Sequence, residues 1–289
     1  MADKKQKRKH DSQFPSLVRG LSPKRQEVIR PLLEHPRRYV LHSLRNLAAE
    51  LGSAPATLLR IAREMGFPRF HDFRRYLHEL SVAQATPFDV LESSTGNSGL
   101  EGRIAESLNH DLANLRGLSH SVDKKRLIAL VKKLYVADSV LVVGGDMAES
   151  LARFLEYNLM VIGLNATGAS GAGEVLHRVR QVGRRDVVIG ISFRRGLRQT
   201  VEALRVARAR GAYAVGITDS SISPVARYAN EYFVAPTEGP LYAGSYVAAL
   251  GLINVLLVVC SHYRRGRTLN VFRELEKEQR SGFRWFTEN

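Results

Sequence analysis

The chain has 289 residues, of which 44% are hydrophobic and 25% charged, so it has the composition of a globular protein and the length for two domains. Its 43 Lys and Arg residues outnumber its 28 Asp and Glu residues, which gives a formal net charge of +15. This excess indicates a polyanionic partner such as nucleic acid, an anionic membrane surface or a phosphorylated ligand. Residues 1–86 hold 17 basic and 8 acidic side chains, so the N-terminal third is the predicted contact for nucleic acid.

Cysteine content and apolar runs argue against a secreted or membrane-embedded protein. The single cysteine, Cys260, excludes an intrachain disulfide and is expected to be a buried apolar side chain. The N-terminal residues MADKKQKRKH lack the apolar segment of a signal peptide. The longest apolar run, residues 247–260, is interrupted by Asn254 and is shorter than the roughly 20 residues that a membrane span needs. We therefore expect a cytoplasmic, nucleoid-associated protein.

Helical periodicity dominates the first third of the chain. Residues 1–14, with a basic run at 4–10, are predicted to form a disordered arm that adds nonspecific attraction to DNA. Four helices are predicted after it, and most of their limits are Ser, Pro or Gly residues that cap, begin or end helices. In chain order, the first helix lies between Ser22-Pro23 and His35-Pro36, and the second between Ser43 and Gly52. The third lies between Pro55 and Gly66, and the fourth contains Phe70 to Leu77.

A change in composition then divides the chain. Residues 83–98, AQATPFDVLESSTGNS, are predicted to be an interdomain linker. Two helical segments follow near 100–115 and 124–134, and a basic helical tail is expected at 269–280. Between them, helices alternate with predicted strands at 139–143, 161–165, 186–192, 212–217 and 232–235. This alternation predicts a parallel sheet that is covered by helices on both faces.

Residues 43–67, SLRNLAAELGSAPATLLRIAREMGF, match the requirements of a helix-turn-helix motif. The motif needs two helices at a steep angle, a tight turn, and polar residues at the start of the second helix. Ala48 is small enough for close helix crossing, Gly52 supplies the turn, and Pro55 begins the recognition helix. Four residues are predicted to face inward: Leu58, Ile61, Ala62 and Met65.

The outward-facing residues of this motif are predicted to contact DNA. Ala56 and Thr57 can touch a thymine methyl group, and Arg60 can pair with guanine, a contact worth roughly 1–3 kcal/mol of discrimination. Ser53 and Arg63 complete the set at the turn and the recognition helix. Phosphate contacts, which position the domain without reading the sequence, are predicted for Arg45, Arg69, His71, Arg74 and Arg75. The alternative for Arg60 and Arg63 is a solvated helix face, but the turn and the local charge favour DNA.

Residues 15–80 resemble the N-terminal domain of the MurR/RpiR family of bacterial transcription regulators. The resemblance rests on LSPKRQEVIRPLLEHP, SLRNLAAELG, APATLLRIAREMGF and FHDFRRYL. It implies a regulator that binds a double-stranded DNA operator. Ala54 stands where the family usually has Ser or a similar cap before the proline, with Ser53 one place earlier, so we expect the cap of the recognition helix to be weakened or shifted.

Residues 122–260 resemble the sugar-isomerase-type (SIS) domain that this family carries at its C-terminus. The matching stretches are ADSVLVVGG, DVVIGIS, GAYAVGITDS and SPVARYANEYFVAP. The resemblance implies a Rossmann-type fold in which loops after the strands bind a phosphosugar. The predicted fold class is therefore a two-domain α plus α/β protein. Its parts are an all-α helix-turn-helix bundle at 15–82, a three-layer parallel-sheet, SIS-like domain at 99–265, and a helical tail at 266–289.

The first predicted phosphate loop departs from the family pattern, which usually reads Gly-x-Gly-x-Ser. This chain has Gly144, Gly145, Asp146, Met147 and Ala148 in that place. Asp146 stands where a glycine is expected, and Ala148 stands where the hydroxyl group is expected. A carboxylate at this position would repel a phosphate group.

The second loop, usually Ser-x-Ser-Gly-x-Thr, keeps only Ser192, and Arg194 and Arg195 replace the Ser-Gly pair. Two interpretations are open. Either the two arginines clamp an anion in place of the hydroxyl groups, with Asp146 binding another part of the ligand, or the pocket is vestigial. Glu238 is included in the predicted effector site, and Tyr242 is a further candidate for its rim.

A phosphosugar isomerase on the same fold is the competing function, because fold alone does not decide function. Isomerisation needs a positioned base and a firm phosphate grip. His177 is the only histidine in the strand and helix core of the second domain, and GEVLHRVRQ indicates an exposed helix face. We therefore expect no catalysis, and we predict neither a metal site nor a cofactor.

The function favoured by the sequence is a DNA-binding regulator that senses a small effector, either a sugar phosphate or another anionic metabolite. Dimeric helix-turn-helix proteins read half-sites that are whole helical turns apart. We therefore expect a homodimer or homotetramer that is held by helices of the second domain. An SIS-like domain that only dimerises is the remaining alternative.

Overall fold

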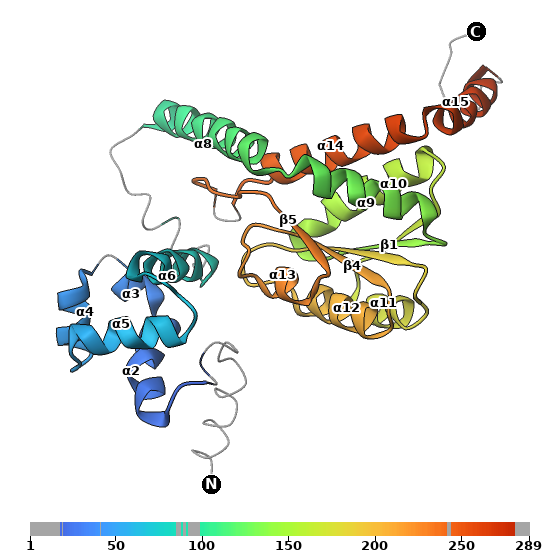
Figure 1. Ribbon diagram of the computed structural model, residues 1–289. Coiled ribbons are helices and arrows are strands. Elements are labelled where there is room, and N and C mark those ends of the chain that lie inside the picture. Colours follow the sequence, from blue (N-terminus) through green and yellow to red (C-terminus); the bar gives the residue numbers. More distant parts are fainter. Residues whose placement is uncertain are drawn as a thin grey trace. The chain divides into compact units, whose positions relative to one another are not determined.

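The computed structural model of the chain divides into two compact units, Met1–Ala85 and Thr86–Asn289 (Figure 1). It describes residues 18, 20–40, 42–84, 88, 91, 99–241 and 244–280. The predicted basic arm, most of the predicted linker and Tyr242 lie outside the described residues. The predicted domain boundaries stay predictions.

The described part of the first unit is helical. Its helices are α2 (Pro23–Glu34), α3 (Pro36–Tyr39), α4 (Leu44–Glu50), α5 (Pro55–Glu64) and α6 (Phe70–Gln84). Apolar residues at helical spacing place one face of each longer helix in a common core. On α5 and just after it, the four residues predicted to face inward are all buried: Leu58, Ile61, Ala62 and Met65.

Local sequence sets the ends of these helices. Ser43 caps α4, because its Oγ accepts a hydrogen bond from the backbone N of Asn46 at 3.2 Å. Ser22 occupies the same position before α2 but makes no side-chain cap bond. Gly52 has a φ of 58°, a conformation that glycine adopts without steric cost, and so allows the turn between α4 and α5. Ala54 caps α5 without a side-chain bond, which confirms the weakened cap.

The second unit is built on a parallel five-stranded sheet in the order β2-β1-β3-β4-β5. The strands are β1 (Val140–Gly144), β2 (Ala166–Ala169), β3 (Val187–Ile191), β4 (Tyr213–Thr218) and β5 (Glu231–Val234). Every residue of β1 and β3 is buried, as expected for a parallel sheet that is covered on both faces. The fold class predicted from the sequence is confirmed.

Helices form a layer on each face of this sheet (Figure 1). One layer contains α9 (Lys124–Val136), α10 (Glu149–Val161) and α14 (Val247–Tyr263), and the other contains α11 (Ala172–Val179), α12 (Arg198–Ala209) and α13 (Pro224–Tyr228). Helix α8 (Leu100–Ser121) packs against α14, and α15 (Arg265–Arg280) follows α14. A short 3₁₀ turn, η3 (Asp146–Ala148), joins β1 to α10.

One predicted strand is wrong. Residues 161–165 are not a strand, because Val161 ends α10 and the strand β2 begins at Ala166. Ile162 and Leu164 are buried, and Gly163 between them has a φ of 84°, so the apolar run is a helix end and a turn. The actual strand, ATGA, has small residues, and the backbone N of its glycine donates to a carboxylate oxygen of Glu156 at 2.6 Å.

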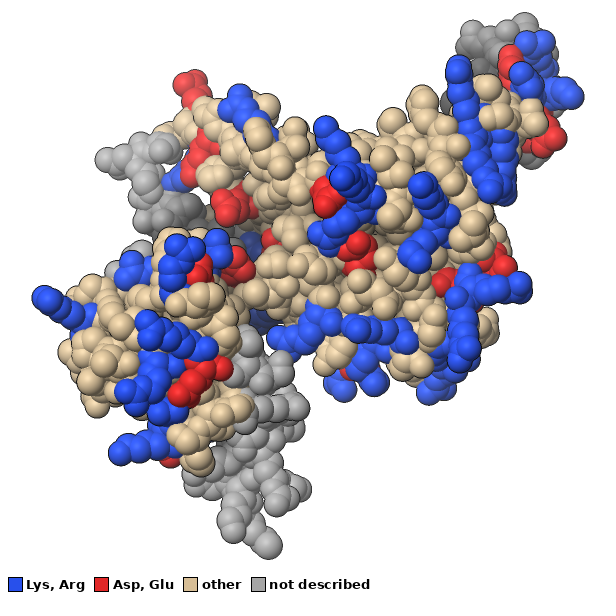
Figure 2. Space-filling model, in the orientation of Figure 1, with Lys and Arg blue, Asp and Glu red and all other residues tan. Residues whose placement is uncertain are grey.

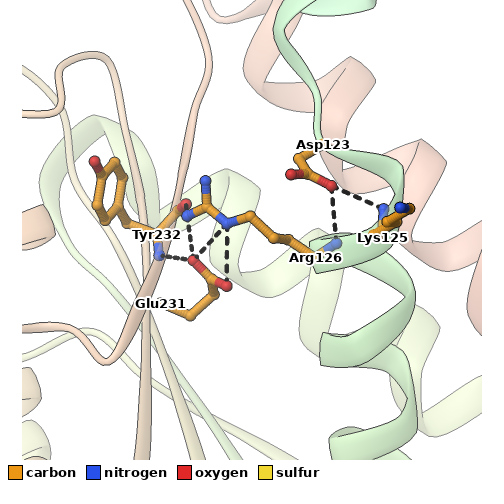
Figure 3. Close-up of polar contacts among 5 residues, drawn as sticks. All are labelled: Asp123, Lys125, Arg126, Glu231 and Tyr232. Carbon is orange, nitrogen blue, oxygen red and sulfur yellow. Dashed lines mark hydrogen bonds and ion pairs between the residues drawn. The ribbon is translucent and has the colours of Figure 1, made fainter.

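The edge strand β5 is tied to α9 by one arginine (Figure 3). The carboxylate of Asp123 caps α9 by accepting hydrogen bonds from the backbone N atoms of Lys125 and Arg126. The guanidinium group of Arg126 donates to the carboxylate of Glu231 and, at 3.0 Å, to the backbone carbonyl of Tyr232. This contact occupies a carbonyl group of an edge strand, a position that is otherwise open to pairing with another chain.

Helix α14 carries Cys260, which is fully buried, as predicted. Burial raises the pKa of the Cys260 thiol to about 12. Among the described residues, no single helix is long and apolar enough to cross a bilayer. When two successive helices are taken together, one pair has the length and composition of a span: α14 and the following Arg265–Glu278. The two members of this pair are bent by 97° relative to each other.

Candidate functional site

Helix α5 presents the residues that are predicted to contact bases. Ala56, Arg60 and Arg63 are exposed, as predicted, whereas Thr57 and Ser53 are half-buried. The guanidinium groups of Arg60 and Arg63 have no ion-pair or hydrogen-bond partner among the described residues. Two unpaired arginines therefore project from one helix that begins directly after a tight turn.

The residues that are predicted to bind phosphates surround this helix-turn-helix, and all of them are exposed: Arg45, Arg69, His71, Arg74 and Arg75. Asp72 forms ion pairs with Arg69 at 3.6 Å and with Arg75 at 3.4 Å. Arg74 donates to the backbone carbonyl of His42 at 3.3 Å, so part of its role is within the fold. Arg45 has no side-chain partner among the described residues and is the least constrained cation of this set.

The predicted effector site lies where the sheet and two loops meet at the carboxyl ends of β1 and β3, the edge at which open α/β sheets bind ligands. Gly144 and Gly145 are buried and allow close packing there. A Cβ atom on Gly144 would lie 2.6 Å from the Cβ of Ala152 and 2.7 Å from a backbone oxygen. A Cβ atom on Gly145 would lie 2.7 Å from Leu197, so the first loop passes directly beneath the start of α12.

Asp146 adopts a positive φ of 53° in the place where the family pattern has glycine. Aspartate tolerates this left-handed conformation better than most residues do. Its side chain is exposed and has no hydrogen-bond or ion-pair partner among the described residues, and Met147 beside it is 45% exposed. The first loop therefore has a left-handed backbone conformation at the position of the family's glycine but carries a carboxylate there.

The second loop is held by hydrogen bonds within the protein. The Oγ of Ser192 accepts a hydrogen bond from the backbone N of Leu197 at 2.7 Å. Arg194 has a φ of 57°, and its backbone N donates to both carboxylate oxygens of Asp219 at 2.9 and 3.0 Å. The half-buried side chain of Arg194 has no partner among the described residues, and Arg195 is exposed.

Two residues that were not singled out from the sequence complete this site. Asp219 follows β4, and burial raises the pKa of its carboxyl group although hydrogen bonds oppose the shift. The ring of Tyr246 packs against Phe193, with 4.9 Å between centroids. Burial raises the pKa of Tyr246, the charge of Arg194 lowers it, and the charges of Asp219 and Asp146 raise it. These charged groups therefore lie within electrostatic range of one phenol.

The segment between β5 and α14 is held by helix α8. The carbonyl oxygen of Glu238, whose side chain is exposed, accepts a hydrogen bond from the Nδ2 of the buried Asn114 at 2.6 Å. The hydroxyl of Ser245 donates to the carboxylate of Asp111. The Oγ1 of Thr237 in this segment also donates to Asp219 at 3.4 Å. The rim of the site is thus joined to α8.

The histidine that was considered as a catalytic base is on the surface. His177 is exposed in the last turn of α11, as predicted. Because α11 runs antiparallel to the strands it connects, its last turn lies at the sheet edge opposite to the loops described above. Within the residues that the structure describes, no group of three His, Cys, Asp or Glu side chains is placed to hold a metal ion.

Comparison with known proteins identifies the class. Residues 133–259 match the family model described as the SIS domain. A Haemophilus influenzae protein named an HTH-type transcriptional regulator is 28% identical over 272 residues, which cover 90% of this chain and 94% of that protein. The fold and these matches define a helix-turn-helix transcription regulator with a C-terminal SIS domain.

Solved structures identify the family. The sugar isomerase domain of the RpiR transcription factor from Sphaerobacter thermophilus is 31% identical, with a TM-score of 0.58, and the match covers 60% of this chain and 98% of that one. The Vibrio vulnificus NanR protein, solved in complex with ManNAc-6P, is 22% identical over 90% of this chain and 94% of its own, with a TM-score of 0.59. The chain belongs to the RpiR family of transcriptional regulators.

Proposed function

We propose that α4 and α5 bind a duplex operator and that the loops after β1, β3 and β4 bind a small anionic metabolite that changes the affinity for DNA. The observation that carries the effector proposal is the side chain of Arg194. It is a half-buried guanidinium group without a partner among the described residues, and its backbone is fixed by the carboxylate of Asp219. A guanidinium group suits carboxylates and phosphates because it donates parallel hydrogen bonds.

The hydrogen bonds of the second loop favour the arginine clamp over a loop that cradles phosphate with its own backbone. The backbone N of Arg194 donates to the carboxylate of Asp219, and the backbone N of Leu197 donates to the Oγ of Ser192. These groups are the donors that a standard phosphate loop would offer to its ligand. The anion is therefore held by side-chain charge, while Asp146 and Tyr246 contact neutral or donor groups of the same ligand. The sugar phosphate in NanR supports this ligand class.

A thermal-shift screen of sugar phosphates and small carboxylates tests the effector site. A ligand at about 100 times its Kd stabilises a protein by about 2.7 kcal/mol, which is a shift of about 5–10 °C for a domain of this size. We expect Arg194→Ala to remove the shift, because the variant loses the anion-binding charge. Arg116→Ala, which removes an exposed arginine from α8, should keep it. An unchanged shift in Arg194→Ala would contradict the clamp.

We infer that this domain senses its ligand and does not isomerise it. His177 is exposed at the opposite sheet edge, and Asp219, the carboxylate that follows β4, is engaged by the backbone of Arg194. The naming of its relatives as transcription regulators supports this inference. Release of an isomerised product from any phosphosugar that binds would overturn it.

The proposed assembly is a homodimer or homotetramer held by the second unit. Helix α8 exposes large apolar side chains at helical spacing, from 37% to 86% exposed: Leu100, Ile104, Leu108, Leu112 and Leu115. An apolar stripe on a helix of 22 residues is typical of a protein contact surface. We expect analytical ultracentrifugation to show a dimer or tetramer, and a Leu108→Glu variant to dissociate it. A monomer at working concentration would contradict the assembly.

A further inference from the structure

The basic charge of the second unit is concentrated on one face. Residues 172–230 hold 11 arginines, no lysine and four acidic residues, whereas the rest of that unit holds 15 basic and 16 acidic residues. This segment contains α11, α12 and α13, which form the helix layer on one side of the sheet. Figure 2 shows blue side chains with few red ones along the lower margin of the second unit, where Figure 1 places these helices.

Most of these arginines are available to a partner. Two of the four acidic residues, Glu174 and Glu202, pair with neighbouring arginines, and the other two accept hydrogen bonds from within the fold. Six exposed arginines form no ion pair among the described residues, and we call them the arginine face: Arg180, Arg184, Arg198, Arg208, Arg210 and Arg227. Such a one-sign surface creates a potential that attracts a polyanion.

The dimensions and composition of the arginine face fit the phosphate backbone of duplex DNA. A helix of the length of α12 is about 18 Å long, and the same length of duplex carries about ten phosphate charges. Guanidinium groups bind phosphate oxygens with two parallel hydrogen bonds, which an ammonium group does not. A membrane-binding face would also need apolar side chains, and Leu176 is the one large apolar side chain on α11–α13 that is strongly exposed among the described residues.

We propose that the arginine face is a second, sequence-independent DNA-binding surface, which contacts duplex phosphates while the helix-turn-helix reads bases. The second domain thereby adds affinity and does not only sense the effector. The site of effector binding is not involved, because the arginine face excludes Arg194 and Arg195.

The test uses the full-length protein and a duplex of unrelated sequence. The triple variant Arg180→Gln, Arg198→Gln and Arg227→Gln removes three exposed cations of the arginine face, one directly after α11, one on α12 and one on α13. The binding constant K for DNA falls with salt, and the slope of log K against log salt concentration is about −0.9 for each phosphate contact. Loss of three contacts should therefore reduce the magnitude of this slope by about 2.7. Between about 50 and 200 mM salt, the Kd of the unchanged protein should therefore rise about 40-fold more than that of the variant.

A matched control removes the same charge from the opposite layer. The triple variant Lys124→Gln, Lys125→Gln and Lys132→Gln changes exposed residues of α9 and should keep the original salt dependence. Changing the three arginines to lysine should restore most of it, which also separates loss of charge from misfolding. Equal salt dependence in the glutamine variant and the unchanged protein overturns the proposal. A second probe is polyglutamate, which stands for an acidic protein. If the glutamine variant loses polyglutamate binding but keeps its DNA binding, the proposal is also overturned, and the face is assigned to an acidic protein.

Discussion

In an Arg60→Ala variant, the preference for the operator over an unrelated duplex is expected to fall by a factor of about 5 to 150. The reason is that a bidentate arginine–guanine contact is worth roughly 1–3 kcal/mol of discrimination. Arg60 is exposed on α5 and has no partner among the described residues, so its guanidinium group can reach a base edge without breaking a contact in the fold. The measurement is the ratio of the two Kd values, with an operator selected from random duplexes.

Arg45→Ala is the matched control for this prediction. Arg45 is also exposed and without a side-chain partner, but it lies on α4, which is expected to contact phosphates. Its loss should weaken both duplexes alike and reduce the salt slope by about 1. Arg74 is a poorer control, because it donates to His42 and its guanidinium lies 5.7 Å from the Phe70 ring centroid. Equal weakening of both duplexes by Arg60→Ala would make Arg60 a phosphate ligand.

Apolar runs in the sequence predict four of the five strands to within one residue at each end. β1, β3 and β4 lie in runs of Val, Ile and other apolar residues that are almost entirely buried, and the half-buried edge strand β5 contains the aromatic and β-branched residues Tyr232, Phe233 and Val234. β2 escapes prediction because ATGA has neither bulk nor alternation, and its place in the sheet comes from pairing with β1. A more apolar run just before it serves as a helix end. Tertiary contacts override local preference there.

The effector site is predictable in its loops but not in its cross-loop contacts. Glycine, serine and arginine positions follow from the motif, but the bond between Arg194 and Asp219 joins residues 25 apart in the chain. It exists because β3 and β4 pair in parallel with Ile191 opposite Ile217, which brings the two strand ends together. Polar residues at the end of a buried strand and directly after it, here Thr218 and Asp219, are the signal that could have shown it. Tyr246 has no comparable signal.

An Asn114→Ala variant is expected to bind the effector but to lose most of its influence on DNA affinity. Asn114 is a buried side chain of α8 whose amide donates to the carbonyl of Glu238 at 2.6 Å, on the rim of the effector site. Helix α8 also lies between the DNA-binding unit and the sheet of the second unit along the chain. A shift of the rim on ligand binding would therefore move α8. Couplings between sites are typically 1–3 kcal/mol, so the loss should be about 5- to 150-fold in the ligand-dependent change of Kd.

A matched control separates the loss of this contact from a loss of helix stability. Asn109→Ala removes the same side chain from an exposed position of α8 and should leave both ligand binding and coupling intact. Asp111→Ala removes the other tie to the rim, the bond from Ser245, and should resemble Asn114→Ala if the two bonds act together. If the ligand changes the affinity for DNA by some factor, DNA must change the affinity for the ligand by the same factor. In the variants, this factor should therefore fall equally whether DNA is titrated with ligand present or ligand is titrated with DNA present. Full coupling in a folded Asn114→Ala, Asp111→Ala double variant would exclude α8 as the route.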